Sequence, residues 1–135
     1  MKIRNRKKKV DTSIQGAVCV IDGDQGIRNS LYILLGTLGV RVVTFASAEE
    51  FLRRLNGERP AFLIAEVSLP GMSAFQLKEA LDRLEIQIPM IGLTGEENAN
   101  GRKEASRLGF LDLVEKPFVY WSVVERVQEV LQPSD

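Results

Sequence analysis

Short apolar segments alternate along the chain with longer segments in which apolar residues recur every three or four positions. A short uninterrupted apolar run is typical of a strand buried on both faces, whereas spacings of three and four are typical of a helix with one buried side. The predicted strands cover residues 17–21, 40–45, 62–67, 90–94 and 110–114. The predicted helices cover residues 25–38, 48–55 and 74–84, a weakly anchored one within 95–108, and 119–131.

This regular alternation predicts an α/β domain in which a five-stranded parallel sheet lies between two layers of helices. In such three-layer, doubly wound folds, functional sites lie where the strands end at their carboxyl edge. Four side chains with reactive or charged groups lie at or just after the ends of predicted strands: Asp22, Glu66, Thr94 and Lys116. They are the candidate site.

Two serines precede predicted helices and are suited to cap them. Ser47, with Glu50 three residues later, matches a reciprocal capping box, and Ser73 is a second candidate cap. In the helix that follows Ser73, helical spacing predicts the inward-facing residues Phe75, Leu77, Ala80, Leu81 and Leu84.

The neutral total charge hides a strong asymmetry. Of 18 basic and 18 acidic residues, six basic ones and no acidic one lie within residues 1–10, so the remaining 125 residues carry 12 basic and 18 acidic groups, a net charge of −6. A run of like charges is typical of a solvated, disordered tail. We therefore assign residues 1–15 to a basic tail, 16–132 to the domain and 133–135 to a C-terminal tail. The alternative is that the basic tail contacts nucleic acid.

The composition excludes several classes of function. The chain has no His, which excludes His-based catalytic triads and His-containing zinc sites. The single Cys19 excludes an internal disulfide and suits a reducing, cytoplasmic environment. No apolar run approaches the roughly 18 residues of a membrane span, so we expect no contact with a membrane. No apolar segment follows the basic start, so we expect no signal peptide.

Four segments at corresponding places after successive strands resemble the receiver domain of two-component response regulators, which has the CheY-like fold. They are residues 44–52 (TFASAEEFL), 69–73 (LPGMS), 93–95 (LTG) and 115–118 (EKPF), and in detail they are similar to the FixJ type. The resemblance covers about residues 17–131. It implies a flavodoxin-like sheet with strand order 2-1-3-4-5 and a signalling domain rather than an enzyme.

The resemblance also implies roles for particular residues. Members of the family receive a phosphoryl group from a phosphohistidine on an Asp at the end of the third strand, with Mg²⁺ held by acids after the first strand. Thr94 and Lys116 occupy the positions that grip the phosphoryl oxygens, and Pro117 occupies the position that aims the lysine. Because this chain has no His, it cannot itself be the phosphohistidine donor.

The chain departs from the family pattern at three positions. Glu66 stands at the acceptor position, Gly23 replaces a metal-binding acid beside Asp22, and Leu113 replaces the aromatic switch residue. Asp24 follows, but we expect it to start the next helix, where an acid is favourable. These departures predict a pseudo-receiver without normal phosphorylation and without bound Mg²⁺.

The Glu66 carboxylate is one methylene longer than that of Asp, so it should reach about 1.5 Å further. It could then contact Lys116 and Thr94 directly through a charge-assisted interaction. Such a contact would either mimic the phosphorylated state or be an ion pair with no signalling role. The sequence leaves both open.

The family signals through the face formed by the fourth helix, fifth strand and fifth helix. On the last helix, Tyr120 falls on the apolar stripe and is expected in the core. Trp121 shares a face with Glu125 and Gln128, which indicates either an exposed interface anchor or a ring packed over the preceding loop. The expected partners are proteins: a histidine kinase, a downstream regulator or a second copy of the chain.

Two other functions stay open beside the pseudo-receiver. The chain could be a working phospho-acceptor that uses Glu66, Asp22 or Asp24, or it could bind nucleic acid through its basic tail. A flavodoxin-type cofactor binder is less favoured, because no phosphate-cradling loop follows the first strand.

Overall fold

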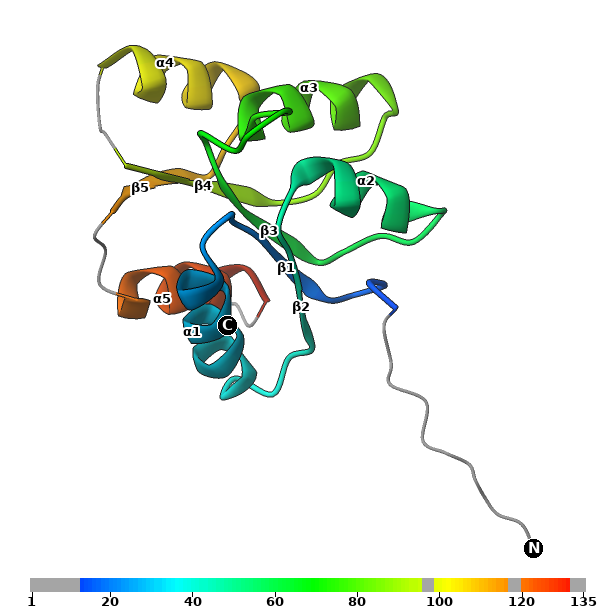
Figure 1. The fold of residues 1–135 in the computed structure, drawn as a ribbon, viewed down its shortest axis with the longest axis vertical. Coiled ribbons are helices and arrows are strands. Elements are labelled where there is room, and N and C mark those ends of the chain that lie inside the picture. Colours follow the sequence, from blue (N-terminus) through cyan, green and yellow to red (C-terminus); the bar gives the residue numbers. More distant parts are fainter. Residues whose placement is uncertain (1–12, 96–98, 117–119, 132–135) are drawn as a thin grey trace, which may run out of the picture.

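The computed structural model of the chain describes residues 13–95, 99–116 and 120–131, and five strands alternate with five helices along it (Figure 1). The strands are β1 (Val18–Ile21), β2 (Val42–Phe45), β3 (Phe62–Glu66), β4 (Met90–Thr94) and β5 (Asp112–Glu115). The helices are α1 (Gln25–Gly36), α2 (Ala48–Leu55), α3 (Ala74–Arg83), α4 (Ala99–Leu108) and α5 (Tyr120–Leu131). The predicted elements are confirmed in number, type and order, and their ends differ by a few residues.

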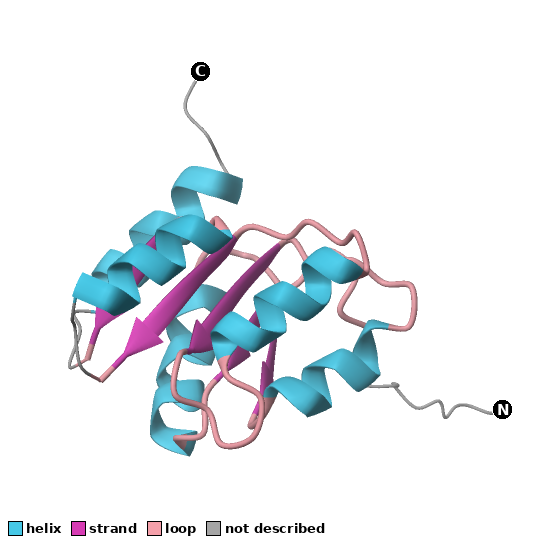
Figure 2. Cartoon of the chain, turned by 90° about the horizontal axis from the view of Figure 1, so that it is seen from above, coloured by secondary structure: helices cyan, strands magenta, loops and turns pink. Residues whose placement is uncertain are grey.

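All strand pairs are parallel and follow the order β2-β1-β3-β4-β5, which confirms the predicted topology. Helices α2, α3 and α4 cover one face of the sheet, and α1 and α5 cover the other (Figures 1 and 2). The parallel register brings the ends of β1, β3, β4 and β5 to one edge, where the candidate site residues were expected.

The core consists of two apolar layers, one on each face of the sheet. Alternate residues of a strand point to opposite faces, so Cys19 and Ile21 of β1 join the layer beneath α2, α3 and α4, whereas Val18 and Val20 join the layer beneath α1 and α5. Both faces of the central strands are buried, which explains their uninterrupted apolar sequences.

One of the two expected helix caps differs from the prediction. The Ser47 hydroxyl accepts a hydrogen bond from the backbone N–H of Glu50, but the Glu50 carboxylate accepts from the N–H of Ala46 rather than from that of Ser47. The reciprocal capping box predicted there is therefore wrong. Ser73 forms a complete one, in which Gln76 accepts from the Ser73 N–H.

The inward orientation predicted for Leu84 is also wrong. Helix α3 ends at Arg83, one residue earlier than expected, and the next residue but one, Glu85, has a φ of 60°. The chain therefore turns away at Leu84, whose side chain is 59% exposed.

Ser13, Ile14 and Gln15, which we had placed in the tail, are part of the packed domain. Ile14 is fully buried in the core layer beneath α2. The Glu58 carboxylate accepts hydrogen bonds from the Ile14 N–H at 2.9 Å and from the Ser13 hydroxyl at 3.0 Å. The Arg41 guanidinium donates to the carbonyls of Ser13 and Gln15. The basic residues 1–10 lie outside the described part of the chain.

The described helices include none that is both long and apolar enough to span a membrane.

The Glu58 contacts predict a pH-dependent contribution to stability. The hydrogen bonds from Ile14 and then Ser13 lower the Glu58 pKa below its ordinary value of 4.5, so their stabilisation is present above that value and is lost as the pH falls through the folded-state pKa. In urea unfolding, Glu58→Gln should be less stable than the parent at pH 7, and the difference should shrink at pH 3.5. The exposed Glu125→Gln serves as control; a Glu58→Gln profile that matches it would contradict the prediction.

Candidate functional site

Asp22 is a fully buried carboxylate in the loop directly after β1. Its Oδ1 accepts a hydrogen bond from the Asp24 N–H at 2.8 Å, and its Oδ2 lies 3.0 Å from the Nζ of Lys116. Burial raises the pKa of Asp22, while the Asp24 N–H and Lys116 partly oppose that shift. Asp22 is thus a costly buried charge that depends on the lysine beside it.

Glu66 ends β3, and its carboxylate contacts the loops that follow β1 and β5. Its Oε2 accepts a hydrogen bond from the Lys116 Nζ at 3.0 Å, and its Oε1 accepts one from the Gly23 N–H at 3.2 Å. The contact with Lys116 that we expected of the longer side chain is thus present.

Lys116 follows β5, and its backbone N–H donates to the carbonyl of Thr94 at 2.6 Å, which fixes the start of the loop beside β4. Its ammonium contacts both Asp22 and Glu66 at 3.0 Å. Burial lowers the pKa of Lys116, but the hydrogen bonds and charges of Asp22 and Glu66 outweigh burial and raise it overall. The three side chains therefore form a cluster with one positive and two negative charges.

Asp24 turns away from this cluster and caps helix α1. Its Oδ1 accepts hydrogen bonds from the N–H groups of Gly26 at 2.7 Å and Ile27 at 3.2 Å. The expected role of Asp24 at the helix start is confirmed.

The side chains at this edge do not fit a divalent cation well. Mg²⁺ prefers several oxygen ligands in octahedral geometry, yet the two carboxylates that meet here, Asp22 and Glu66, already contact the Lys116 ammonium. Within residues 13–95, 99–116 and 120–131, no group of three acidic, Cys or His side chains is placed to hold a metal ion. We therefore derive no chemical step through a metal.

Thr94, the last residue of β4, is nearly buried and lies opposite Glu115 in the register. It lines a cavity of about 330 Å³ together with Glu66, Phe75 and Leu113. The structure thus brings Thr94 and the Glu66 acceptor position to one cavity. Pro117 lies outside the described residues.

Leu113, at the switch position in β5, points inward across β4 and is 7% exposed. It pairs in register with Gly92, and a Cβ added to that glycine would lie 2.9 Å from the Leu113 Cδ1. Any larger residue at Gly92 would displace Leu113. Gly92 within an otherwise apolar strand is the sequence signal of this close approach.

Glu49, whose role was not predicted, stabilises the turn between β3 and α3. Its Oε2 accepts from the Met72 N–H at 2.9 Å, a bond that lowers the Glu49 pKa. Gly71 in this turn has a φ of 76°, and an added Cβ would lie 2.6 Å from the same carboxylate oxygen. A glycine is required there for both reasons.

On the predicted partner face, Trp121 is 59% exposed near the start of α5, which favours the exposed one of the two alternatives that the sequence left open. Beside it, β5 and α5 border a cavity of about 350 Å³ lined by charged groups of both signs, among them Arg102, Asp112 and Arg126. Arg126 contacts Asp112 at 2.9 Å. The side chain of Tyr120 lies outside the described part of the chain.

Known proteins resemble this chain along most of its length. The family model of the response regulator receiver domain matches residues 18–128. The chain is 33% identical over 115 residues to Nodulation protein W of Bradyrhizobium diazoefficiens, covering 85% of this chain and 51% of that protein. It is 32% identical over 111 residues to the transcriptional regulatory protein FixJ of Rhizobium meliloti, covering 82% and 54%. The chain thus spans about half the length of these relatives.

Solved structures agree with the sequence relatives. The structure of FixJ-N is 32% identical to this chain with a TM-score of 0.75, and the match covers 84% of this chain and 91% of FixJ-N. A response regulator receiver protein from Pseudoalteromonas atlantica is 26% identical with a TM-score of 0.79, covering 88% and 99%.

Removing the shared ammonium should destabilise the domain. Lys116→Met leaves the buried Asp22 carboxylate without its cation, so we expect a loss of about 3 kcal/mol in the free energy of unfolding at pH 7. The loss should be smaller at pH 5, because protonation of Asp22 relieves the buried charge. Urea unfolding of the variant at both pH values measures this.

Two comparisons make that measurement specific. Lys103→Met removes an exposed lysine of α4 and should change stability little. Adding Asp22→Asn to Lys116→Met should recover part of the loss. If Lys116→Met behaves like Lys103→Met, the ammonium does not stabilise the cluster.

Proposed function

The chain belongs to the response regulator receiver domain family, and from that premise we propose that it is a cytoplasmic pseudo-receiver that signals by protein contact without normal phosphorylation. The observation that carries the proposal is the Lys116 ammonium, which lies 3.0 Å from both Glu66 and Asp22. The Glu66 carboxylate thus already neutralises the Lys116 ammonium at the edge of the sheet where a phosphoryl group would bind.

The acceptor carboxylate is also poorly placed to attack a phosphoryl group. Both of its oxygens are engaged, one by Lys116 and the other by the Gly23 N–H. Phosphoryl transfer depends mainly on positioning, and a carboxylate that is displaced by about 1.5 Å and held by two donors loses that positioning. Gly23 adds no carboxylate to bind a cation that would offset the charge of the incoming group.

We infer that Glu66 holds the domain in one conformation rather than being an ion pair without consequence. The same edge carries a second fixed element, since Leu113 fills the space above Gly92 and so lies inward. Glu66 and Leu113 line one cavity. The ion pair of Glu66 with Lys116 and the packing of Leu113 over Gly92 therefore favour one and the same conformation of the residues around Thr94.

The proposed partners are proteins that dock on the face of α4, β5 and α5, such as a histidine kinase or a downstream regulator. Trp121 gives this face an exposed aromatic anchor of the kind that often dominates binding energy. The mixed charges around Arg126 and Asp112 could also complement a second copy of the chain in a homodimer. A separate candidate function is nucleic-acid contact through residues 1–10. Binding that weakens with salt and is lost when those residues are deleted would indicate it.

The test of this proposal is acceptance of a phosphoryl group from acetyl phosphate in the presence of Mg²⁺. We expect no gain in intact mass for the parent chain. The double variant G23D/E66D should gain one phosphoryl group, because it restores both acids. It should also fold, since a Cβ at Gly23 would lie 3.8 Å from the nearest atom, the Glu66 Oε1, and the shorter side chain withdraws that oxygen.

The single variants separate the two departures. If Glu66 alone prevents the reaction, E66D gains mass by itself, whereas a requirement for both acids leaves each single variant unmodified. A mass gain in the unmodified chain that disappears in Glu66→Gln would refute the pseudo-receiver and support the working phospho-acceptor.

A further inference from the structure

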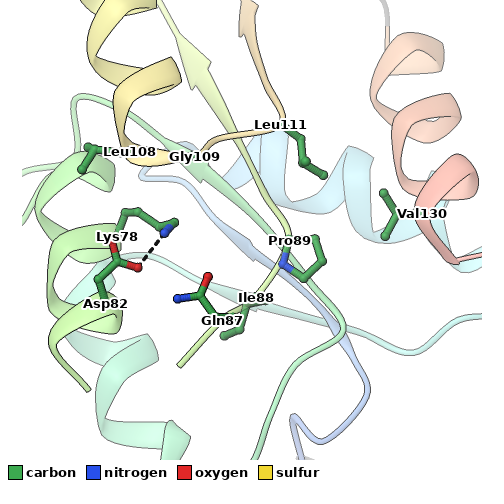
Figure 3. A pocket seen from close by; sticks show the side chains of 9 residues that line it. All are labelled: Lys78, Asp82, Gln87, Ile88, Pro89, Leu108, Gly109, Leu111 and Val130. Carbon is green, nitrogen blue, oxygen red and sulfur yellow. Dashed lines mark hydrogen bonds and ion pairs between the residues drawn. The ribbon is translucent and has the colours of Figure 1, made fainter. Parts of the chain in front are cut away.

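A second pocket lies at the amino edge of the sheet, opposite the Glu66 site. It has a volume of about 630 Å³ and is formed where α3, α4 and α5 approach the starts of β4 and β5 (Figure 3). The Lys78–Asp82 pair lies on one side of it, and the apolar side chains of Leu111 and Val130 lie on the other, with Ile88 and Pro89 between them. A largely apolar pocket of this size with few polar groups is typical of a small-molecule site.

Lys78 is an unusual lining residue for such a pocket, because lysine side chains are rarely buried and this one is only 8% exposed. Its ammonium donates one hydrogen bond, to the Asp82 Oδ1 at 2.7 Å. Across the residues that the structure describes, Asp82 is its only polar partner. An ammonium has three N–H donors, so two donors have no acceptor among the described residues. Lys78 lines the pocket on the same side as Asp82 and the Gln87 amide (Figure 3). Buried donors without acceptors are costly, which favours a ligand that supplies an acceptor.

The charges around the pocket disfavour an anion as that ligand. Asp82 is already negative and lies beside Lys78. The pocket also borders the C-terminal ends of α3 and α4, at Asp82 and Leu108, where the helix dipole contributes partial negative charge. An uncharged head group avoids this repulsion and can still accept from Lys78 and donate to Asp82.

We propose that this pocket binds a small uncharged molecule with an apolar ring and a head group of the primary amide type. The ring lies among Ile88, Leu111 and Val130, and the amide carbonyl accepts from Lys78 while its N–H₂ donates to Asp82. The site is independent of phosphorylation and of the Glu66 cluster.

Benzamide, benzoate and toluene test the head group, because they share one ring and differ in the substituent. Each is titrated into the isotope-labelled full chain, and backbone amide shifts are followed by NMR. We expect benzamide to shift the resonances of Ile88, Gly109 and Leu111, with a dissociation constant on the order of 1 mM, as suits so small a ligand. Benzoate should bind at least about tenfold more weakly.

Two variants test the named contacts. Lys78→Met preserves the length of the stem and should weaken benzamide binding about tenfold, while toluene binding stays the same. Asp82→Asn removes the negative charge, so the preference should move from benzamide toward benzoate. Lys78→Gln provides a second lysine variant should the first disturb the fold, which the NMR spectrum reveals directly.

Three results would overturn the proposal: no probe shifts the pocket resonances, benzamide and benzoate bind the parent equally, or Lys78→Met binds benzamide as the parent does. A further outcome identifies another occupant. If the pocket resonances move with protein concentration in the absence of any probe, a second copy of the chain covers the pocket and the small-molecule site is refuted.

Discussion

The Lys116 ammonium, shared by the Asp22 and Glu66 carboxylates, joins three of the five strands at the carboxyl edge of the sheet. Asp22 follows β1, Glu66 ends β3 and Lys116 follows β5, so this contact spans strands that are far apart in the sequence. A fully buried Asp22 carboxylate is tolerable only with a cation beside it. That requirement places Lys116, and through its N–H bond to the Thr94 carbonyl it also fixes the start of the loop after β5.

The two departures from the family pattern at Gly23 and Glu66 are physically linked. The longer Glu66 side chain brings one carboxylate oxygen to the Gly23 N–H and the other to Lys116. An acid at position 23 would add a third negative charge beside that oxygen, which Lys116 alone would not offset without a bound cation. The loss of an acid at Gly23 is thus what lets Glu66 occupy the centre of the edge.

The fold could be predicted because apolar runs and helical spacing are local signals that also agree with one topology. The parallel topology then predicts that the ends of the strands meet at one edge. This places Asp22, Glu66, Thr94 and Lys116 near one another before any side-chain contact is known. Side-chain partners could not be predicted in the same way, since they depend on distances between segments that the sequence does not contain. The inward position predicted for Leu84 failed because an early helix end, set by the backbone at Glu85, overrides the spacing of apolar residues.

In the proposed pseudo-receiver, the charges at this edge of the sheet would oppose phosphorylation of Glu66 while it remains paired with Lys116. With Lys116 the cluster already carries a net charge of −1. Conversion of the Glu66 carboxylate into an acyl phosphate would exchange one negative charge for about two, so the net charge would reach about −2. The Leu113 side chain, which packs over Gly92, has neither a charge nor a hydroxyl with which it could respond to phosphorylation. The stability of the cluster and the proposed inability of Glu66 to accept a phosphoryl group would therefore have one cause.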